Sequence, residues 1–286
     1  MSSACDSCPS ASKCKSQDSC PSLNKGESNP RPFLEKLGDD SHITRVIGVA
    51  SGKGGVGKSF VTSMLAVELA RKGYKVGIMD ADITGPSIPR AFGLKGRMAA
   101  TEQGRMSPVS SAKGIEVVSL NLIMDDEEAP VVWRGPVISG LVKQFWTDVC
   151  WGTLDVLLID MPPGTGDVPL TVFQAVPLDG LVLVSTPQDL VSMIVAKARN
   201  MASMMNVNIL GVVENMSYTI CPHCGEKLSL WGNDDALAES SAKAGIDILD
   251  KLPLDHEAMK KVDSGRAEDV EADYLSNTVK KITDLL

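Results

Sequence analysis

One eight-residue segment, GKGGVGKS at residues 52–59, limits the fold more than any other part of this 286-residue chain. It fits the phosphate-binding pattern G-x-x-x-x-G-K-[ST] at every fixed position. An apolar, β-branched run, RVIGVAS at residues 45–51, precedes it, and a segment with helical periodicity that stops at Gly73 follows it. A Gly-rich loop in this position turns backbone N–H groups and a helix N-terminus toward phosphate oxygens. The sequence therefore predicts a nucleotide-binding strand, loop and helix.

From residue 43 onward, short apolar strands alternate with helical segments. The expected strands are KVGIMD, DVLLID, GLVLVST and ILGVVENM, and the expected helices lie near residues 170–176, 190–205 and 234–244. The last segment, YLSNTVKKITDLL, places on one helical face Leu275, Val279, Ile282 and Leu286. Such alternation is typical of a parallel sheet covered on both faces. We expect an α/β, doubly wound, mostly parallel sheet of the P-loop NTPase type, with ligands at the carboxyl ends of the strands.

The N-terminal part of the chain differs in composition from the rest. It is rich in Ser and Pro and poor in large aliphatic residues, so burial cannot offset its ordering entropy and we expect it to be flexible. It carries four cysteines, Cys5, Cys8, Cys14 and Cys20, which can form a metal or cluster site within one chain. Zinc and unligated thiols are the alternatives. We divide the chain into a Cys-rich segment, residues 1–40, and a P-loop ATPase domain, residues 41–286.

Net charge and hydropathy limit the cellular compartment and the classes of binding partner that we expect for this chain. The net charge of −8 argues against broad nucleic-acid binding, and no apolar run approaches the ~20 residues of a membrane span. The first residues have neither a basic start nor a hydrophobic segment, so no secretory signal is expected. We therefore expect a cytoplasmic protein with neither a nucleic-acid nor a membrane partner. In that reducing compartment, the seven cysteines favour metal or redox chemistry, except Cys150, which lies among apolar residues and is expected to be buried.

The phosphate-binding loop assigns several roles. Lys58 is expected to reach the β- and γ-phosphates of ATP, and the Ser59 hydroxyl to ligate Mg²⁺. Lys53 is an additional lysine after the first glycine; it either faces solvent or points at the nucleotide of a facing subunit, as an arginine finger does. The other expected nucleotide-binding residues of the loop are Gly52, Gly54, Gly55, Val56 and Gly57.

Three aspartates follow strands that neighbour this loop. Asp80 and Asp82 end one strand, and they share a side if the chain stays extended. Asp160 ends another and is the Walker-B residue expected to hold Mg²⁺, together with Asp80 and Ser59. Asp82 is the candidate for orienting the attacking water, so the predicted catalytic residues are Lys53, Lys58 and Asp82. One aspartate at a strand end can be a helix cap or a solvated carboxylate, but three beside a P-loop favour a functional site.

These residues resemble a known family. GKGGVGKS with its additional Lys53 is similar to the deviant Walker A motif of the MinD/ParA/nitrogenase-iron-protein group of dimeric ATPases. Within that group, five further segments are similar to the Mrp/ApbC branch: MDADITGPSIP, VVWRGP (residues 131–136), IDMPPGTGD, STPQD (residues 185–189) and VENMSYTICPHCG. The resemblance covers residue 43 to the C-terminus. It implies an ATP-dependent carrier or scaffold for iron–sulfur clusters with weak, regulatory ATP hydrolysis.

The resemblance also implies roles for single residues. Lys53 matches the lysine that crosses the dimer interface, Asp82 the switch I aspartate, and Asn215 an asparagine near the adenine. Cys221 and Cys224 match the pair by which two subunits of a homodimer hold one [4Fe–4S] cluster. Near the N-terminus, the eukaryotic cytosolic scaffold has the spacing C-x13-C-x2-C-x5-C. Here Cys5, Cys8 and Cys14 fit the last three positions, the upstream cysteine is absent, and Cys20 lies downstream.

Read from the residues, Cys221 and Cys224 admit three interpretations. A thioredoxin-like pair needs a helix start, and the following GEKLSLWG is a poor helix. A zinc knuckle needs two further ligands, and His223 is badly placed to be one. A two-fold dimer supplies four thiolates from two copies of the pair, and this ligand count together with the resemblance favours a bridging cluster.

The leading hypothesis is an ATP-binding carrier that transfers a [4Fe–4S] cluster to apo-proteins under the control of ATP binding and hydrolysis. One alternative is a MinD/ParA-type positioning ATPase with zinc-bound cysteines, which would need a membrane-binding tail or a basic patch. The other is an electron-transfer ATPase.

Overall fold

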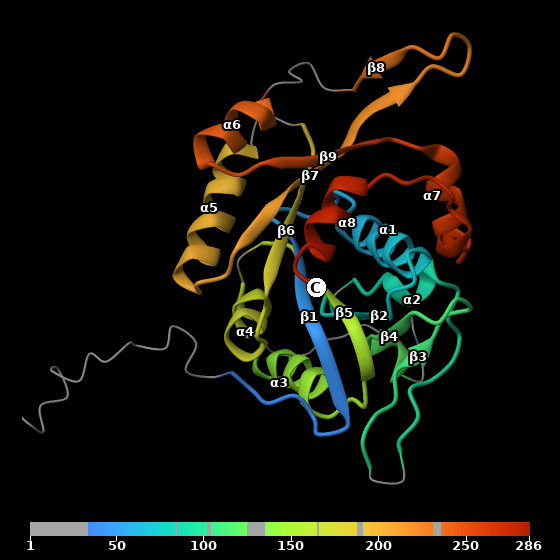
Figure 1. The fold of residues 1–286 in the computed structure, drawn as a ribbon, viewed down its shortest axis with the longest axis vertical. Helices are drawn as coiled ribbons and strands as arrows, with labels where there is room; N and C mark the ends of the chain where they lie inside the picture. Colours follow the sequence, from blue (N-terminus) through green and yellow to red (C-terminus); the bar gives the residue numbers. More distant parts are fainter. Residues whose placement is uncertain are drawn as a thin grey trace, which may run out of the picture.

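The structure is a computed structural model that describes residues 34–83, 85–101, 104–124, 135–164, 166–187, 191–230 and 236–286 (Figure 1). The strands are β1 Ser41–Ser51, β2 Val76–Asp80, β3 Val109–Ser110, β4 Glu116–Val118, β5 Gly152–Asp160, β6 Gly180–Ser185, β7 Ile209–Ile220, β8 Lys227–Ser229 and β9 Ile248–Pro253. The α-helices are α1 Lys58–Arg71, α2 Ile88–Ala91, α3 Gly135–Thr147, α4 Asp167–Ala175, α5 Val191–Met204, α6 Ala236–Ala244, α7 His256–Asp263 and α8 Ser276–Thr283.

These strands form one sheet in the order β3-β4-β2-β5-β1-β6-β7-β8, with β9 paired to β7. The pairs β3–β4 and β7–β8 are antiparallel and the others are parallel. The central strand β1 lies between β5 and β6, so the loop that follows it opens at the middle of the carboxyl edge. The predicted doubly wound, mostly parallel sheet is confirmed.

Two apolar layers hold the helices against the sheet. On one face of the sheet, helices α3, α4 and α6 pack through the side chains of Phe145, Trp146, Phe173 and Leu237. On the other face, helices α1, α2 and α8 pack through side chains such as Leu65, Ile88 and Val279. Figure 1 shows the two groups of helices on opposite sides of the strands. Within the described part of the chain, no helix is both long and apolar enough to cross a membrane.

A buried carboxylate joins α1 to the C-terminal segment. Glu68 accepts hydrogen bonds from the backbone N–H groups of Tyr274, at 2.8 Å, and Leu275, at 3.1 Å. Burial raises the pKa of Glu68 to about 7, even though both N–H groups favour the charged form. Helix α1, which begins at Lys58, is thus anchored to the residues that precede α8.

Some predicted features need correction. Cys150 is half-buried rather than buried. Of the four residues predicted to share one helical face, Leu275, Val279 and Ile282 are buried, but Leu286 lies beyond the end of α8 at Thr283 and is 40% exposed. Strands β3, β4, β8 and β9 and helices α2, α3 and α7 were not anticipated. Three of these strands have only two or three residues, and β9 interrupts its apolar residues with Asp250 and Lys251, so neither pattern signals a buried strand.

Residues shortly before β1 attach to the body of the domain. The backbone N–H of Glu35 donates to the carbonyl of Ala175 at 2.9 Å, and the Glu35 carbonyl accepts from the Trp146 indole at 3.0 Å. The predicted N-terminal site, with Cys5, Cys8, Cys14 and Cys20, lies outside the described residues.

Candidate nucleotide site and cysteine hairpin

The phosphate-binding loop leaves β1 and enters α1 with two glycines in the left-handed region, Gly55 at φ 79° and Gly57 at φ 77°. A Cβ atom at Gly57 would lie 2.2 Å from the amide nitrogen of Asn215, so only glycine fits there. The loop, Asp82 and Pro163 surround a cavity of about 220 Å³. The predicted strand, loop and helix are present, and the loop is placed to receive phosphate groups.

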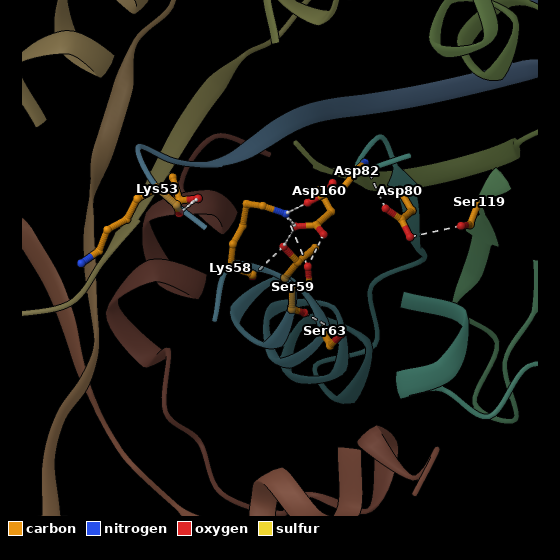
Figure 2. A network of polar contacts seen from close by, with 10 residues as sticks. Lys53, Lys58, Ser59, Ser63, Asp80, Asp82, Ser119 and Asp160 are labelled. Carbon is orange, nitrogen blue, oxygen red and sulfur yellow. Dashed lines mark hydrogen bonds and ion pairs between the residues drawn. The ribbon is translucent and has the colours of Figure 1, made fainter. Parts of the chain in front are cut away.

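Lys58, Ser59 and Asp160 form one compact polar cluster below this loop (Figure 2). The Lys58 ammonium lies 2.8 Å from one carboxylate oxygen of Asp160, and the Ser59 hydroxyl donates to the other at 2.5 Å. The Thr62 hydroxyl also donates to Asp160, at 2.8 Å. Lys58 is 6% exposed and Asp160 is fully buried. The structure therefore brings together the residues predicted to bind phosphate and Mg²⁺.

Asp80 and Asp82 lie next to this cluster but have different partners. Asp80 is buried beside Asp160 in the β2–β5 register, and its carboxylate accepts from the Ser119 hydroxyl and from the backbone N–H of Asp82, both at 3.1 Å. Burial and the neighbouring Asp160 charge raise the pKa of Asp80 well above its usual range. The Asp82 carboxylate lies 3.5 Å from the Lys58 ammonium. Their predicted roles with Mg²⁺ and water stay predictions.

Lys53 does not join the Lys58–Asp160 cluster. Its backbone carbonyl accepts from the Ser51 hydroxyl at 3.0 Å, while Figure 2 shows its side chain directed away from Lys58. This direction suits a lysine that acts outside its own phosphate loop. Its action on a facing subunit stays a prediction.

A larger cavity of about 410 Å³ continues from the phosphate loop between α1, α2, α7, the middle of β7 and the end of β9. Asn215 lines it and donates its side-chain amide to the carbonyl of Val56 at 2.9 Å, as suits a residue near a base. The other lining residues include Phe60, Arg90, Met216, Leu254 and Asp255, which the sequence reasoning missed. Recognising β9 as a strand would have placed residues 253–255 at the same carboxyl edge.

Cys221 and Cys224 lie at the turn of the β7–β8 hairpin, which Figure 1 shows projecting beyond the body of the molecule. The Cys221 N–H donates to the Glu226 carbonyl, and the Gly225 N–H donates to the Cys221 carbonyl, both at 2.9 Å. Gly225 has φ 75°, so a left-handed residue closes the turn. Cys224 is exposed and Cys221 half-buried. The pair thus forms a tight, accessible knuckle.

Hydrogen bonds within the turn also act on the Cys221 sulfur. Backbone N–H groups of Cys224 and His223 donate to its sulfur and lower the pKa of the Cys221 thiol, which favours the thiolate that metals bind. Within the described residues, no group of three or more His, Cys, Asp or Glu side chains could hold a metal ion. The hairpin therefore brings two cysteine sulfur atoms together, and the described part of one chain adds no third metal-binding side chain to them.

Parts of the recognised motifs fall outside the described residues. These are Thr84 of MDADITGPSIP, residues 131–134 of VVWRGP, Thr165 of the PPGTGD loop, and Gln188 and Asp189 of STPQD.

A phosphate loop after the central strand, a buried carboxylate at the end of β5 and an adjoining cavity define a P-loop NTPase. The family described as ParA, NUBPL iron-transfer P-loop NTPase, matches residues 42–286, and the chain belongs to this family. The iron-sulfur cluster carrier protein of Clostridium perfringens is 46% identical over 278 residues, which are 94% of this chain and 95% of that protein. The protein of the same description from Methanocaldococcus jannaschii is 40% identical over 91% of this chain and 87% of its own length.

Solved structures agree on the fold. A nucleotide-binding protein from Archaeoglobus fulgidus, in complex with ADP, is 45% identical with a TM-score of 0.72, covering 81% of this chain and 90% of that one. The cell division ATPase MinD of Pyrococcus furiosus is 19% identical with a TM-score of 0.60, covering 85% and 98% of the two chains. The second likeness shows the fold alone.

Proposed function

We propose that this protein is an ATP-binding iron–sulfur cluster carrier that holds a [4Fe–4S] cluster as cargo between two copies of the chain and passes it to apo-proteins. The observation that carries the proposal is the joining of a nucleotide site and an exposed two-cysteine knuckle in one domain. Membership of an iron-transfer NTPase family and relatives described as iron-sulfur cluster carriers support it.

Ligand counting supports a cluster shared by two subunits. A [4Fe–4S] cluster takes four thiolates, and Cys221 and Cys224 supply two. A two-fold axis beside the hairpin would bring the same two residues from a second copy. The hydrogen bonds that favour the Cys221 thiolate suit this role.

The face of the hairpin that carries Cys221 is also apolar. Thr219 pairs with Leu228, so alternation along the two strands places Cys221, Leu228 and Leu230 on one face. Leu228 and Leu230 are 44% and 39% exposed. Packed against the same face of a second copy, these leucines would exclude water from the cluster. This supports a homodimer as the form that holds the cargo.

The nucleotide site would control that dimer. Lys58 and the loop N–H groups bind the phosphates, Asn215 lies near the adenine, and Asp82 orients the attacking water. Ser59, Asp80 and Asp160 would hold Mg²⁺, which neutralises phosphate charge when bound; their oxygen atoms are the ligands that this ion prefers. Lys53 would reach the nucleotide of the facing subunit, so hydrolysis would depend on the dimer. We further propose that the four N-terminal cysteines bind a second cluster or metal.

The experiment is anaerobic reconstitution of the full chain with iron and sulfide, in a background where the four N-terminal cysteines are alanine. We expect about four iron atoms per dimer and their loss in Cys221→Ala and Cys224→Ala. Cys150→Ala is the matched control and should keep the iron. Full iron retention in the Cys221 and Cys224 variants, or zinc in place of iron and sulfide in the parent protein, would contradict the proposal.

A further inference from the structure

Strand β7 joins the two sites by a short, direct path. Asn215 and Met216 line the nucleotide cavity, and Cys221 follows five residues after Met216. At about 3.3 Å per residue, the strand covers this distance in under roughly 20 Å. One strand therefore extends from the nucleotide cavity to the cysteine knuckle.

The strand is irregular where it passes the cavity. Glu214 pairs with Lys251 and Tyr218 pairs with Pro253, so the three residues between Glu214 and Tyr218 lie opposite a single residue of β9. Met216, at the centre of this bulge, has φ 55°, in the left-handed region that side chains with a Cβ rarely adopt. The pairing of β7 with β6 ends at Glu214. The bulge thus separates the part of β7 held in the sheet from the hairpin.

Contacts from the nucleotide site and from β9 fix the bulge. Asn215 donates to the phosphate loop at the carbonyl of Val56, at 2.9 Å. The Met216 methyl group would lie 3.5 Å from a Cβ atom placed on Gly57, so its side chain reaches the same loop. On the other side, the Ser217 hydroxyl donates to the buried carboxylate of Glu214, which pairs with Lys251 at 3.2 Å.

The base of the hairpin has a second link to the cavity. The backbone N–H of Leu254 donates to the carbonyl of Tyr218 at 2.7 Å, and Leu254 also lines the cavity. A ligand that moves Met216 would therefore act on the bulge that precedes the hairpin. A ligand that moves Leu254 would act on Tyr218, at the base of the hairpin. Because the hairpin projects from the domain, a small rotation of its base at Tyr218 produces a larger displacement of Cys221 at its turn.

We propose that the residue 215–217 bulge is a hinge, and that a nucleoside diphosphate or triphosphate in the cavity sets the angle of the β7–β8 hairpin through Met216. Met216 is a positioning residue: it acts on the cysteines through the strand. The consequence for cargo rests on the proposed function, because the angle of each hairpin decides whether two cysteine pairs can meet across a dimer. The nucleotide would in this way control assembly and opening of the cluster site.

Hydrogen–deuterium exchange of the full, cluster-free chain tests the hinge. In the unsubstituted protein, saturating MgADP should change the exchange of hairpin amides in residues 218–229 on the order of fivefold. Met216→Gly, which removes the side chain and relieves the backbone, should reduce this change to within about twofold. Ser217→Ala should do the same by releasing Glu214, and its side chain does not line the cavity. ADP affinity, measured in parallel, sets the saturating concentration for each variant.

Asn206→Gly is the matched control. Asn206 and Met216 are the two non-glycine residues with positive φ in the described part of the chain, and Asn206 precedes β7 at the opposite end. The control should keep the full nucleotide effect. An exchange pattern unaffected by MgADP in the unsubstituted protein, or an effect that survives intact in both bulge variants, would overturn the hinge. Absence of iron binding would instead overturn the carrier function and leave the exchange result standing.

Discussion

The ammonium of Lys58 lies 2.8 Å from the carboxylate of Asp160, so the residue expected to bind phosphate is paired with the residue expected to bind Mg²⁺. Ser59, the other expected Mg²⁺ ligand, donates to the same carboxylate. Phosphate oxygens of the nucleotide compete with Asp160 for the Lys58 ammonium, and Mg²⁺ competes with Lys58 for the Asp160 carboxylate. The phosphate groups and Mg²⁺ therefore break the same ion pair, each by binding one of its two members. Binding of nucleotide and of metal should therefore be strongly coupled.

Asp160→Asn tests this coupling. The amide keeps the shape of the side chain but removes the charge that Mg²⁺ needs, so Mg²⁺ should no longer strengthen ATP binding. We expect the affinity measured with Mg²⁺ to fall at least about tenfold, while the affinity in EDTA is unchanged or improved because Lys58 is released. Isothermal titration calorimetry with and without Mg²⁺ measures both values. Asp155→Asn, five residues earlier in β5, where the carboxylate accepts from the backbone N–H of Lys75, is the control. An intact Mg²⁺ effect in Asp160→Asn would contradict the assignment.

Lys53 and Lys58 should be separable by mixing two inactive variants. Lys58→Ala should abolish nucleotide binding, and Lys53→Ala should bind ATP but not hydrolyse it. If Lys53 acts on the facing subunit, a mixed dimer contains one complete site, and an equimolar mixture should recover about a quarter of the wild-type rate. Phosphate release from the mixture measures it. A mixture as inactive as its components would mean that both lysines act within one subunit.

The apolar face of the hairpin should contribute to holding the two copies together. Leu228→Ser and Leu230→Ser each remove exposed apolar area that the dimer would bury, at a cost of about 1–2 kcal/mol. We expect the dimer loaded with iron and sulfide to dissociate about tenfold more readily, measured by analytical ultracentrifugation. Ile220→Ser is the control, because Ile220 is more exposed, at 54%, yet lies on the opposite face. Equal weakening by all three substitutions would contradict a face-specific contact.

The raised pKa of Glu68 makes stability depend on pH. Its ordinary pKa is 4.5 and burial raises it to about 7, so between these values the folded chain holds a proton that the unfolded chain releases. The contribution of the protonated Glu68 to the free energy of unfolding is complete below pH 4.5 and is lost as the pH rises through 7. Relative to wild type, Glu68→Gln should therefore gain about 1–3 kcal/mol in free energy of unfolding between pH 4.5 and 8. Urea unfolding across this range measures the difference, and a constant difference would show that Glu68 titrates normally in the fold.

The central strands and the phosphate loop could be predicted because local sequence encodes them. Strands buried on both faces are continuous apolar runs, and the loop between Gly52 and Ser59 needs glycines and a lysine at fixed spacing. Strand β9 escaped prediction because Asp250 and Lys251 interrupt its apolar pattern: the Asp250 carboxylate accepts from the Thr278 hydroxyl at 2.6 Å, and Lys251 pairs with Glu214. Such partners lie far along the chain and leave no local signal.

The sequence by itself determined the phosphate loop, the aspartates at the strand ends and the two cysteines, because each depends on residue type at short spacing. Only the tertiary structure decided how they are connected. It pairs Lys58 with Asp160, gives Asp80 and Asp82 different partners, and places Met216 in a bulge between the nucleotide cavity and the knuckle. These relations depend on strand register and side-chain packing between segments far apart in the chain, which residue spacing does not encode.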